Sequence, residues 1–398
     1  MRGESEAERG ESLVQRTASK TVLTVCTRLW NQAKRLTTQV RRRSRQIHVR
    51  GLAIGGDAPV TVQSMTKTDT RDVAATMTEI RRLHVAGCEI VRLAVPDREA
   101  AEALAQIRQR TDLPLVADIH FDYRLALAAL EAGVDKLRLN PGNIGGRAKV
   151  EEVVRAASAR GVPIRIGVNA GSLEKDILER SGRVPEALVE SALRHVGILE
   201  DCGFADIVVS LKAADVRTMV AAYEMIAERI DYPLHLGVTE AGPTFQGTIK
   251  STVGIGHLLA EGIGDTIRVS LTGDSGEEVR VGLEILYALE LREKRLEIVS
   301  CPSCGRCEID LFTVVREAEK RLQGEDLPAM KVAIMGCVVN GPGESIEADV
   351  GLAGGNGLGI LFRNGQIVRR VQESEMIDAL VEECRAYAAE RRQSEHAG

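Results

Sequence analysis

Eight short runs of apolar, mostly β-branched residues recur between residues 60 and 271, and amphipathic stretches separate them. Strands that alternate with helical patterns form βαβ units and a parallel sheet. Eight such units, spaced about 30 residues apart, are the number that closes a (β/α)8 barrel. The runs are VTVQSM (60–65), IVRLAV (90–95), LVADIH (115–120), KLRLN (136–140), IRIGVN (164–169), IVVSLK (207–212), LHLGVTE (234–240) and TIRVSL (266–271). An open doubly wound sheet is the alternative, but no G-x-G-x-x-G motif follows the first run. We therefore predict an α/β fold built on a TIM-type barrel.

The rest of the chain divides around this barrel, which we place at residues 41–295. Within it, QIHVRGLAIGG (46–56) is typical of a short hairpin that would plug the barrel floor. Residues 296–398 carry a second pattern of strands and helices and predict a small α+β domain. Residues 1–40 lack clear periodicity, and the four glutamates among the first 11 residues argue against an Arg-rich transit peptide. We expect this segment to be a disordered or dispensable extension.

Composition narrows the classes of function. The formal net charge of −5 gives no reason to expect nucleic acid as a partner. No apolar stretch of about 18 residues exists, so we expect no membrane span. The eight cysteines come without a convincing signal peptide. A disulfide framework belongs to small secreted domains, so the sequence favours a cytoplasmic protein whose reduced thiols bind a metal centre.

Polar side chains gather where the predicted strands end, which is the end that carries the chemistry in barrel enzymes. Arginine suits bidentate contact with phosphate oxygens, and lysine adds a point charge. The Gly-rich stretches 140–146 and 272–276 each precede a predicted helix, whose amino-terminal amides favour phosphate. We therefore predict a pocket for a small molecule that bears a diphosphate. The cations expected to face it are Arg92, Arg138, Arg165, Lys212 and Arg268.

Other strand-end residues complete this predicted site. Glu240 and Asp118 are candidate acid–base groups because each follows an apolar strand, where partial desolvation tunes proton affinity. For both, a carboxylate that only orients a neighbouring arginine is the alternative. The remaining candidates for substrate contact are His120, Asn140, Asn169, Ser210 and Ser270.

Four cysteines cluster after the barrel. Cys301, Cys304 and Cys307 lie in CPSCGRC, and Cys337 follows an apolar run and precedes an Asn-Gly-Pro-Gly turn. A structural zinc ion would take all four thiolates. An iron–sulfur cluster could take three, with an exchangeable oxygen donor such as Glu344 on the remaining iron. The spacing alone leaves both metals open.

Several segments together carry a resemblance to a known family. They are RQIHVRGLAIGGDAPVTVQSMT, KLRLNPGNIG, RIGVNAGSL, VSLKAAD, GVTEAG, CPSCGR and GCVVNGPGE. From about residue 41 to about residue 390, the chain resembles the flavodoxin/ferredoxin-dependent 4-hydroxy-3-methylbut-2-enyl diphosphate synthase family in its two-domain bacterial form. This resemblance implies an iron–sulfur oxidoreductase of the methylerythritol phosphate route to isoprenoids. It also implies a homodimer with reduced flavodoxin or ferredoxin as the electron donor.

The resemblance assigns roles that spacing does not. It implies a 4Fe–4S cluster held by Cys301, Cys304, Cys337 and Glu344. The implied substrate, 2-C-methyl-D-erythritol 2,4-cyclodiphosphate, would lie among the strand-end cations, and Glu240 would give a proton to the departing hydroxyl. Position 307 is often Thr in this family, so Cys307 is expected to stay unligated and its role is open. Two other hypotheses are a zinc-stapled barrel that binds a phosphate ligand without redox chemistry, and a pterin-dependent barrel transferase.

Overall fold

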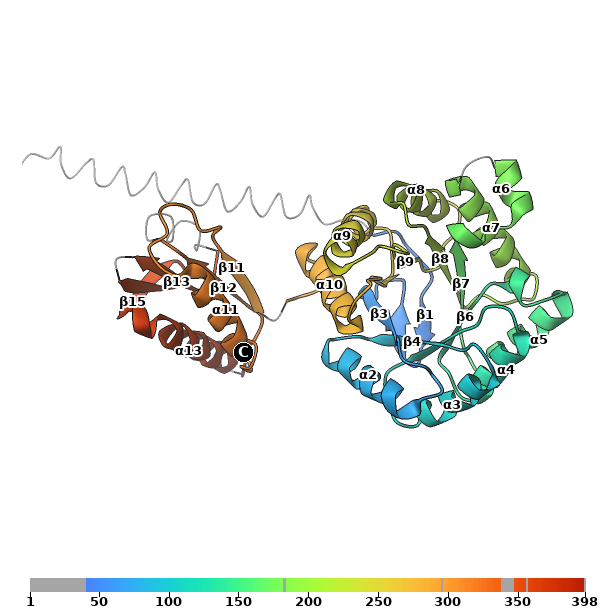
Figure 1. Ribbon diagram of the computed structural model, residues 1–398, viewed down its shortest axis with the longest axis horizontal. Coiled ribbons are helices and arrows are strands. Elements are labelled where there is room, and N and C mark those ends of the chain that lie inside the picture. Colours follow the sequence, from blue (N-terminus) through green and yellow to red (C-terminus); the bar gives the residue numbers. More distant parts are fainter. Residues whose placement is uncertain (1–40, 182–183, 295, 338–346, 356, 397–398) are drawn as a thin grey trace, which may run out of the picture. The chain divides into compact units, whose positions relative to one another are not determined.

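The computed structural model describes most of the chain, in two compact units (Figure 1). One unit extends to Leu291 and the other begins at Arg292. Among the described residues, no helix combines the length and apolarity needed to cross a membrane. The described residues are 41–181, 184–294, 296–337, 347–355 and 357–396.

The first unit is a closed ring of eight parallel strands. The strands are β3 (Thr61–Met65), β4 (Ile90–Ala94), β5 (Leu115–Asp118), β6 (Lys136–Leu139), β7 (Ile164–Asn169), β8 (Ile207–Lys212), β9 (His235–Leu236) and β10 (Thr266–Ile267). They are hydrogen-bonded in the order β8-β7-β6-β5-β4-β3-β10-β9. A parallel bridge between Val209 and Leu234 joins the two ends of this order. The predicted (β/α)8 barrel is confirmed, with β9 and β10 shorter than their apolar runs.

Helices follow the strands and surround the ring (Figure 1). They are α2 (Val73–Val85), α3 (Arg98–Arg108), α4 (Tyr123–Glu131), α5 (Arg147–Ser158), α6 (Lys175–Ser181), α7 (Val184–Glu200), α8 (Val216–Ala227), α9 (Thr244–Ala260) and α10 (Ser275–Ala288), with the short 3-10 helices η1 (Pro141–Asn143) and η2 (Ala170–Ser172). Five of these helices begin after an aspartate whose carboxylate accepts a backbone N–H of the first turn, which stabilises the helix start. The capping residues are Asp72, Asp97, Asp122, Asp215 and Asp274.

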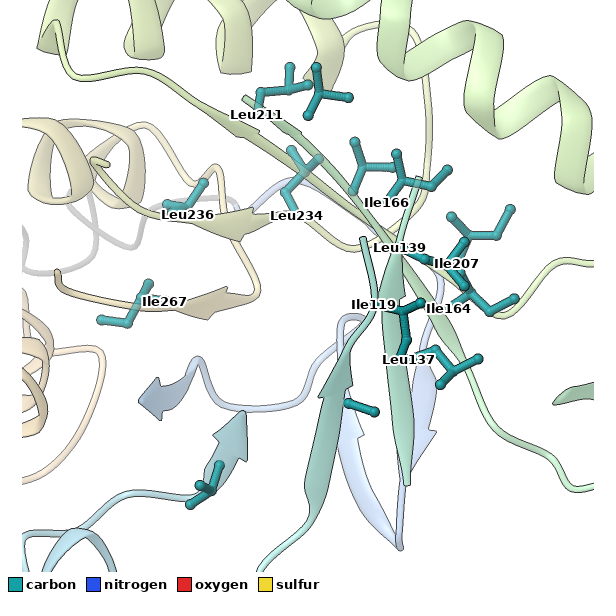
Figure 2. Packing of buried hydrophobic residues seen from close by; sticks show 14 of the residues in the cluster. Ile119, Leu137, Leu139, Ile164, Ile166, Ile207, Leu211, Leu234, Leu236 and Ile267 are labelled. Atoms are coloured by element: carbon teal, nitrogen blue, oxygen red, sulfur yellow. The ribbon is translucent and has the colours of Figure 1, made fainter. Parts of the chain in front are cut away.

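The two faces of each barrel strand have different chemistry. Leu137, Ile164 and Ile207 are fully buried and belong to the large apolar cluster that includes helix residues (Figure 2). Because successive side chains of a strand point to opposite faces, the alternate residues point into the barrel. Those alternate residues include Arg138 and Arg165, both buried. The helices therefore pack on an apolar outer face, and polar side chains fill much of the interior.

A hairpin closes the amino-terminal end of the barrel. Strands β1 (Ile47–Val49) and β2 (Leu52–Ile54) pair antiparallel, as predicted for this segment. Ile47, Val49 and Ile54 form one apolar cluster with residues from the starts or lower parts of three barrel strands, Ile90, Val116 and Val208. The floor of the barrel is thus apolar and filled, and the charged side chains lie above it.

In its described residues, the second unit has a five-stranded sheet and two long helices, which confirms a small α+β domain. Its elements are β11 (Leu296–Ser300), α11 (Leu311–Leu322), β12 (Met330–Met335), β13 (Val350–Gly355), β14 (Leu358–Arg363), β15 (Gln366–Gln372), η3 (Glu373–Glu375) and α13 (Met376–His396). The strands are ordered β11-β12-β13-β14-β15; the first three are mutually parallel and the last two pairs are antiparallel. Strand β11 was not predicted, because it is a partly exposed edge strand without a clear alternation.

Candidate functional site

The five predicted cations come from strands β4, β6, β7 and β8 and from the residue after β10, and they are largely buried. Burial, and then the charges of four nearby arginines, lower the pKa of the Lys212 ammonium far below its ordinary value. Contacts place these residues in one region, since Asp118 reaches both Arg92 and Arg138, Arg138 pairs in register with Arg165, and a Cβ on Gly237 would meet both Lys212 Nζ and Arg268 O. The residues brought together are Arg92, Arg138, Arg165, Lys212 and Arg268.

Asp118, at the end of β5, lies among three basic side chains. Its carboxylate is 3.2 Å from Arg138 Nη1, 3.8 Å from Arg92 Nε and 3.4 Å from His120 Nε2. Burial alone would raise the pKa of Asp118, but the charges of Arg92 and Arg138 and the contact with His120 outweigh it and hold this pKa well below its usual range. The group therefore remains a carboxylate at neutral pH.

A second buried carboxylate, Glu278 on α10, was missed from the sequence. It accepts from Ser64 Oγ at 3.1 Å and from Leu271 N at 3.0 Å. It also pairs with Lys67 Nζ at 3.2 Å and with Arg268 Nη2 at 3.4 Å. Glu278 thus connects the end of β3 to the end of β10 and holds Arg268 through Nη2. A helical pattern identifies such a residue only as a polar position, so no signal singled it out.

Two strand glycines make room for the long cationic side chains. A Cβ on Gly167 would lie 2.3 Å from Arg138 Nε, which is closer than atoms can approach. Arg138 instead donates to Gly167 O at 2.8 Å, and Gly167 N donates to Asn140 Oδ1 at 2.9 Å. In the same way, a Cβ on Gly237 would lie 3.0 Å from Lys212 Nζ. The amide oxygen of Asn140 therefore supports the strand ends and leaves only its NH2 group for a ligand.

The loops after β6 and β10 are held by specific contacts. Gly142 N donates to His195 Nδ1 at 3.2 Å, and a Cβ on Gly142 would lie 2.6 Å from the His195 ring. His195 also contacts Glu174 at 3.2 Å, so this helix histidine anchors the Gly-rich loop. Both predicted Gly-rich stretches do precede helices, α5 and α10. After β10, Ser270 Oγ accepts from Arg268 Nη1.

The remaining predicted contacts differ in how far they reach into the barrel. Ser210 is buried, whereas the His120 side chain is 57% exposed. Asn169 is half-buried at the end of β7. Glu240 has a left-handed backbone, with φ 52°, and is exposed. The partial desolvation expected for Glu240 is therefore not provided by the described residues of the barrel. A strained non-glycine residue at a barrel mouth is a feature that often marks function.

Several buried polar atoms deeper in the barrel have no hydrogen-bond partner. They include Lys136 Nζ, His235 Nε2, both amide atoms of Gln63, and Nε and Nη1 of Arg165. Lys136 opens β6 and was not predicted as a site residue. The alternation of the strand could have identified it, because Lys136 lies two residues before Arg138 and shares its face.

The barrel interior carries a large excess of positive charge among the residues that the structure describes. The only carboxylates that we find paired with the strand-end cations in this part of the chain are Asp118 and Glu278. Buried cations without counter-ions are costly, so the arrangement fits an anionic ligand with several charged oxygens. The interior cations are Arg92, Lys136, Arg138, Arg165, Lys212 and Arg268.

The cysteines of the second unit lie at neighbouring strand ends. Cys301 follows β11 and Cys337 follows β12, and these parallel strands pair Ser300 with Ile334. Gly336 N donates to Cys301 Sγ at 3.3 Å, and Cys307 N donates to Cys304 O at 2.9 Å. All four thiols are free.

The donor set suits a soft metal centre. Thiolates from adjacent strand ends are ligands that both iron–sulfur clusters and zinc accept. In the described part of the chain, no three His, Cys, Asp or Glu side chains are close enough together to hold a metal ion. Glu344, the oxygen ligand implied by resemblance, lies outside the described residues. Cys307 Sγ packs against Gly336, where a Cβ would lie 2.4 Å from the sulfur.

Comparison with known proteins covers both units. The GcpE TIM-barrel domain family matches residues 44–283, and the GcpE protein C-terminal domain family matches residues 297–386. The 4-hydroxy-3-methylbut-2-en-1-yl diphosphate synthase (flavodoxin) of Geobacter sulfurreducens is 63% identical over 346 residues, which are 87% of this chain and 98% of that protein. The protein of the same name from Symbiobacterium thermophilum is 61% identical, covering 86% of this chain and 93% of its own length.

Among solved structures, the dihydropteroate synthase of Stenotrophomonas maltophilia aligns with a TM-score of 0.47 and 18% identity, over 62% of this chain and 98% of that chain. The two family matches together span both structural units, and the relatives match nearly end to end. The chain therefore belongs to the GcpE family.

Proposed function

We propose that this protein reductively opens 2-C-methyl-D-erythritol 2,4-cyclodiphosphate and removes a hydroxyl group, giving 4-hydroxy-3-methylbut-2-enyl diphosphate in the methylerythritol phosphate route to isoprenoids. The names and high identity of the relatives support this assignment. The observation that carries it in the structure is the excess of buried cations over carboxylates inside the barrel. A doubly ionised cyclic diphosphate supplies the missing counter-charge.

In this proposal the barrel cations bind and orient the diphosphate. Arg138 and Arg165 offer planar guanidinium groups to two phosphate oxygens each, and Lys212 adds a point charge. Arg268 contacts Ser270 through Nη1 and Glu278 through Nη2, which leaves its buried Nε as the donor for the ligand. Polar contacts from the strand ends complete the site, and the residues proposed for them are Arg92, His120, Asn140, Asn169, Ser210 and Ser270.

We assign different roles to the two candidate acid–base residues. Asp118 orients Arg92 and Arg138, because a carboxylate whose pKa is held so low has no proton to give at neutral pH. Glu240 stands at the open mouth and donates the proton that leaves with the hydroxyl as water. The overall change consumes two electrons and one proton, breaks the ring C–O bond to phosphate, and releases one water.

The second unit provides the redox centre in this proposal. Cys301, Cys304 and Cys337, with Glu344, would hold a 4Fe–4S cluster, which supplies the electrons singly after receiving them from reduced flavodoxin or ferredoxin. We further propose a homodimer in which the small domain of one subunit covers the barrel mouth of its partner. Such a cover would exclude water from around the exposed Glu240.

Anaerobic purification and turnover test this function. Brown protein with stoichiometric iron and sulfide, which converts the cyclic diphosphate when a reduced donor is added, is the expected result. The alternative result is a colourless protein that holds zinc through the cysteines and binds the cyclic diphosphate without converting it. That result would refute the enzyme hypothesis and support the hypothesis of a zinc-containing barrel that only binds the ligand. A Glu240→Gln variant with full turnover would remove Glu240 from the acid role.

A further inference from the structure

Lys136 is the most isolated charge in the barrel. It opens β6, its side chain is fully buried, and its Nζ has no hydrogen-bond partner. Its register partner on β5 is Val116, which belongs to the apolar cluster of the barrel floor. Lys136 therefore lies next to the floor layer, on the same face as Arg138, and Arg92 on β4 pairs in register with the same Val116.

The groups around Lys136 make its positive charge unfavourable when no ligand is bound. The cations that approach it come from β4, β7 and β9, as Arg92, Arg165 and His235. The same region contains Arg138 on β6, Lys212 on β8 and Arg268 on β10. On the acidic side, Asp118 on β5 pairs with arginines and with His120, and Glu278 on α10 pairs with Arg268 and Lys67.

Neither carboxylate forms an ion pair with Lys136. Burial first, and then the charges of Arg165 and Arg92, lower the pKa of Lys136 well below its ordinary value. The pKa of His235, which is fully buried beside it, is lowered in the same way. A neutral amine is the form of Lys136 that this surrounding favours.

We infer that Lys136 is a member of the anion site, neutral in the ligand-free protein and protonated from solvent when the cyclic diphosphate binds. The inference rests on the proposed function, which supplies the ligand. The phosphate oxygens provide the counter-charge that the barrel lacks, so the bound ligand stabilises the ammonium form. Binding is then coupled to proton uptake, and by linkage the affinity depends on pH.

The ligand itself does not obscure this effect. Each phosphorus of a cyclic diphosphate carries one strongly acidic hydroxyl, which is ionised throughout the neutral range. Protons taken up on binding near neutral pH therefore go to the protein. Asp118 and Glu278 are not the acceptors in this scheme, because the ligand is an anion and both carboxylates are held by arginine contacts.

The test measures binding of the cyclic diphosphate to the full-length holoprotein by calorimetry under anaerobic conditions. The cluster is kept oxidised and no electron donor is added, so that no turnover occurs. Titrations in buffers of different ionisation enthalpy count the protons taken up. We expect uptake by the wild type and a dissociation constant that rises about tenfold per pH unit for each proton. Lys136→Met keeps the length of the side chain and should take up one proton fewer, with binding weakened about 10- to 100-fold.

Two readouts separate this role from a structural one. Without ligand, Lys136→Met should melt no lower than the wild type, because burying a lysine that must first give up its proton opposes folding and methionine carries no such cost. Lys250→Met, which alters an exposed lysine on α9, should match the wild type in affinity and proton uptake.

Wild-type binding without proton uptake or pH dependence would overturn the inference alone, whatever the variants do. Unchanged uptake in a folded Lys136→Met protein would also overturn it, and would place the proton on Lys212 or His235. If the folded wild type does not bind the cyclic diphosphate at all, the proposed function fails and this inference fails with it.

Discussion

Replacing Asp118 by Asn tests whether this carboxylate compensates the buried arginines. The substitution keeps the shape of the side chain and removes its charge. In the structure Asp118 lies 3.2 Å from Arg138 Nη1 and 3.8 Å from Arg92 Nε, and the two arginine side chains are 8% and 13% exposed. Removing one partner of a buried ion pair costs about 3–5 kcal/mol, because the other charge stays buried and unpaired.

The cost can be read as a melting temperature. For a unit of this size, about 1 kcal/mol corresponds to about 2–4 °C, so the barrel of Asp118→Asn should melt about 6–20 °C below the wild type without ligand. The cyclic diphosphate should restore much of the difference, because its oxygens replace the lost carboxylate as counter-charge. Differential scanning calorimetry with and without ligand measures both effects.

A matched substitution provides the control. Asp176→Asn removes a carboxylate that pairs with Arg194 at 2.8 Å on the surface, where solvent screens the charges. Its melting temperature should stay close to that of the wild type. If Asp118→Asn melts no lower than Asp176→Asn in the absence of ligand, the buried arginines do not depend on Asp118 and the electrostatic account of the site is refuted.

The pH dependence follows from the same contacts. The pKa of Asp118 is lower in the folded barrel than in the unfolded chain. The stabilisation by its charge is therefore fully present above the ordinary aspartate pKa, and it is lost as pH falls through the lower folded value. The difference in melting temperature between wild type and Asp118→Asn should hold at neutral pH and shrink in strong acid. A difference that grows as the pH falls would contradict this sign.

Three further substitutions probe other parts of the site. Glu278→Gln should lower the melting temperature of the barrel and weaken binding of the cyclic diphosphate, because Arg268 loses the charge that orients it. Calorimetry measures both effects, and an unchanged affinity would show that Arg268 does not depend on Glu278. Gly167→Ala should weaken binding of the cyclic diphosphate about tenfold or more, while the circular dichroism spectrum stays native. The new Cβ would displace the Arg138 guanidinium, and one charge-assisted hydrogen bond contributes about 1.5–3 kcal/mol. Cys337→Ala should lose iron, sulfide and brown colour without lowering the melting temperature of the barrel, and full metal content in this variant would remove Cys337 from the ligand set.

The sequence predicted the barrel well because its strands are continuous apolar runs with clear starts. Six of the eight strands match their runs within one or two residues. Strands β9 and β10 are two residues each, although their runs extend to residues 240 and 271. Gly237 directly follows β9, and a Cβ there would lie 2.6 Å from Arg268 O and 3.0 Å from Lys212 Nζ, so close packing requires a glycine where the apolar run continues.

The site was predicted only where its residues lie within a predicted strand run or directly after it. The strand-end cations were identified because polar residues interrupt an apolar pattern there. Glu278 lies on an amphipathic helix, where a glutamate is ordinary, and its burial depends on contacts with Ser64 and Arg268 that are remote in sequence. Lys136 stands at the start of its strand, and attention to strand ends alone excluded it. His195 reaches the Gly-rich loop from α7, which no local pattern reveals.

The hairpin that fills the barrel floor leaves one end of the barrel for exchange with solvent. A ligand of the interior cations would approach them from the end opposite the hairpin, and a product would leave by the route its successor uses to enter. A molecule bound at that end would therefore compete with substrate. The apolar layer formed by Ile54, Val116 and Val208 also keeps water away from the floor, which strengthens every Coulomb interaction directly above it.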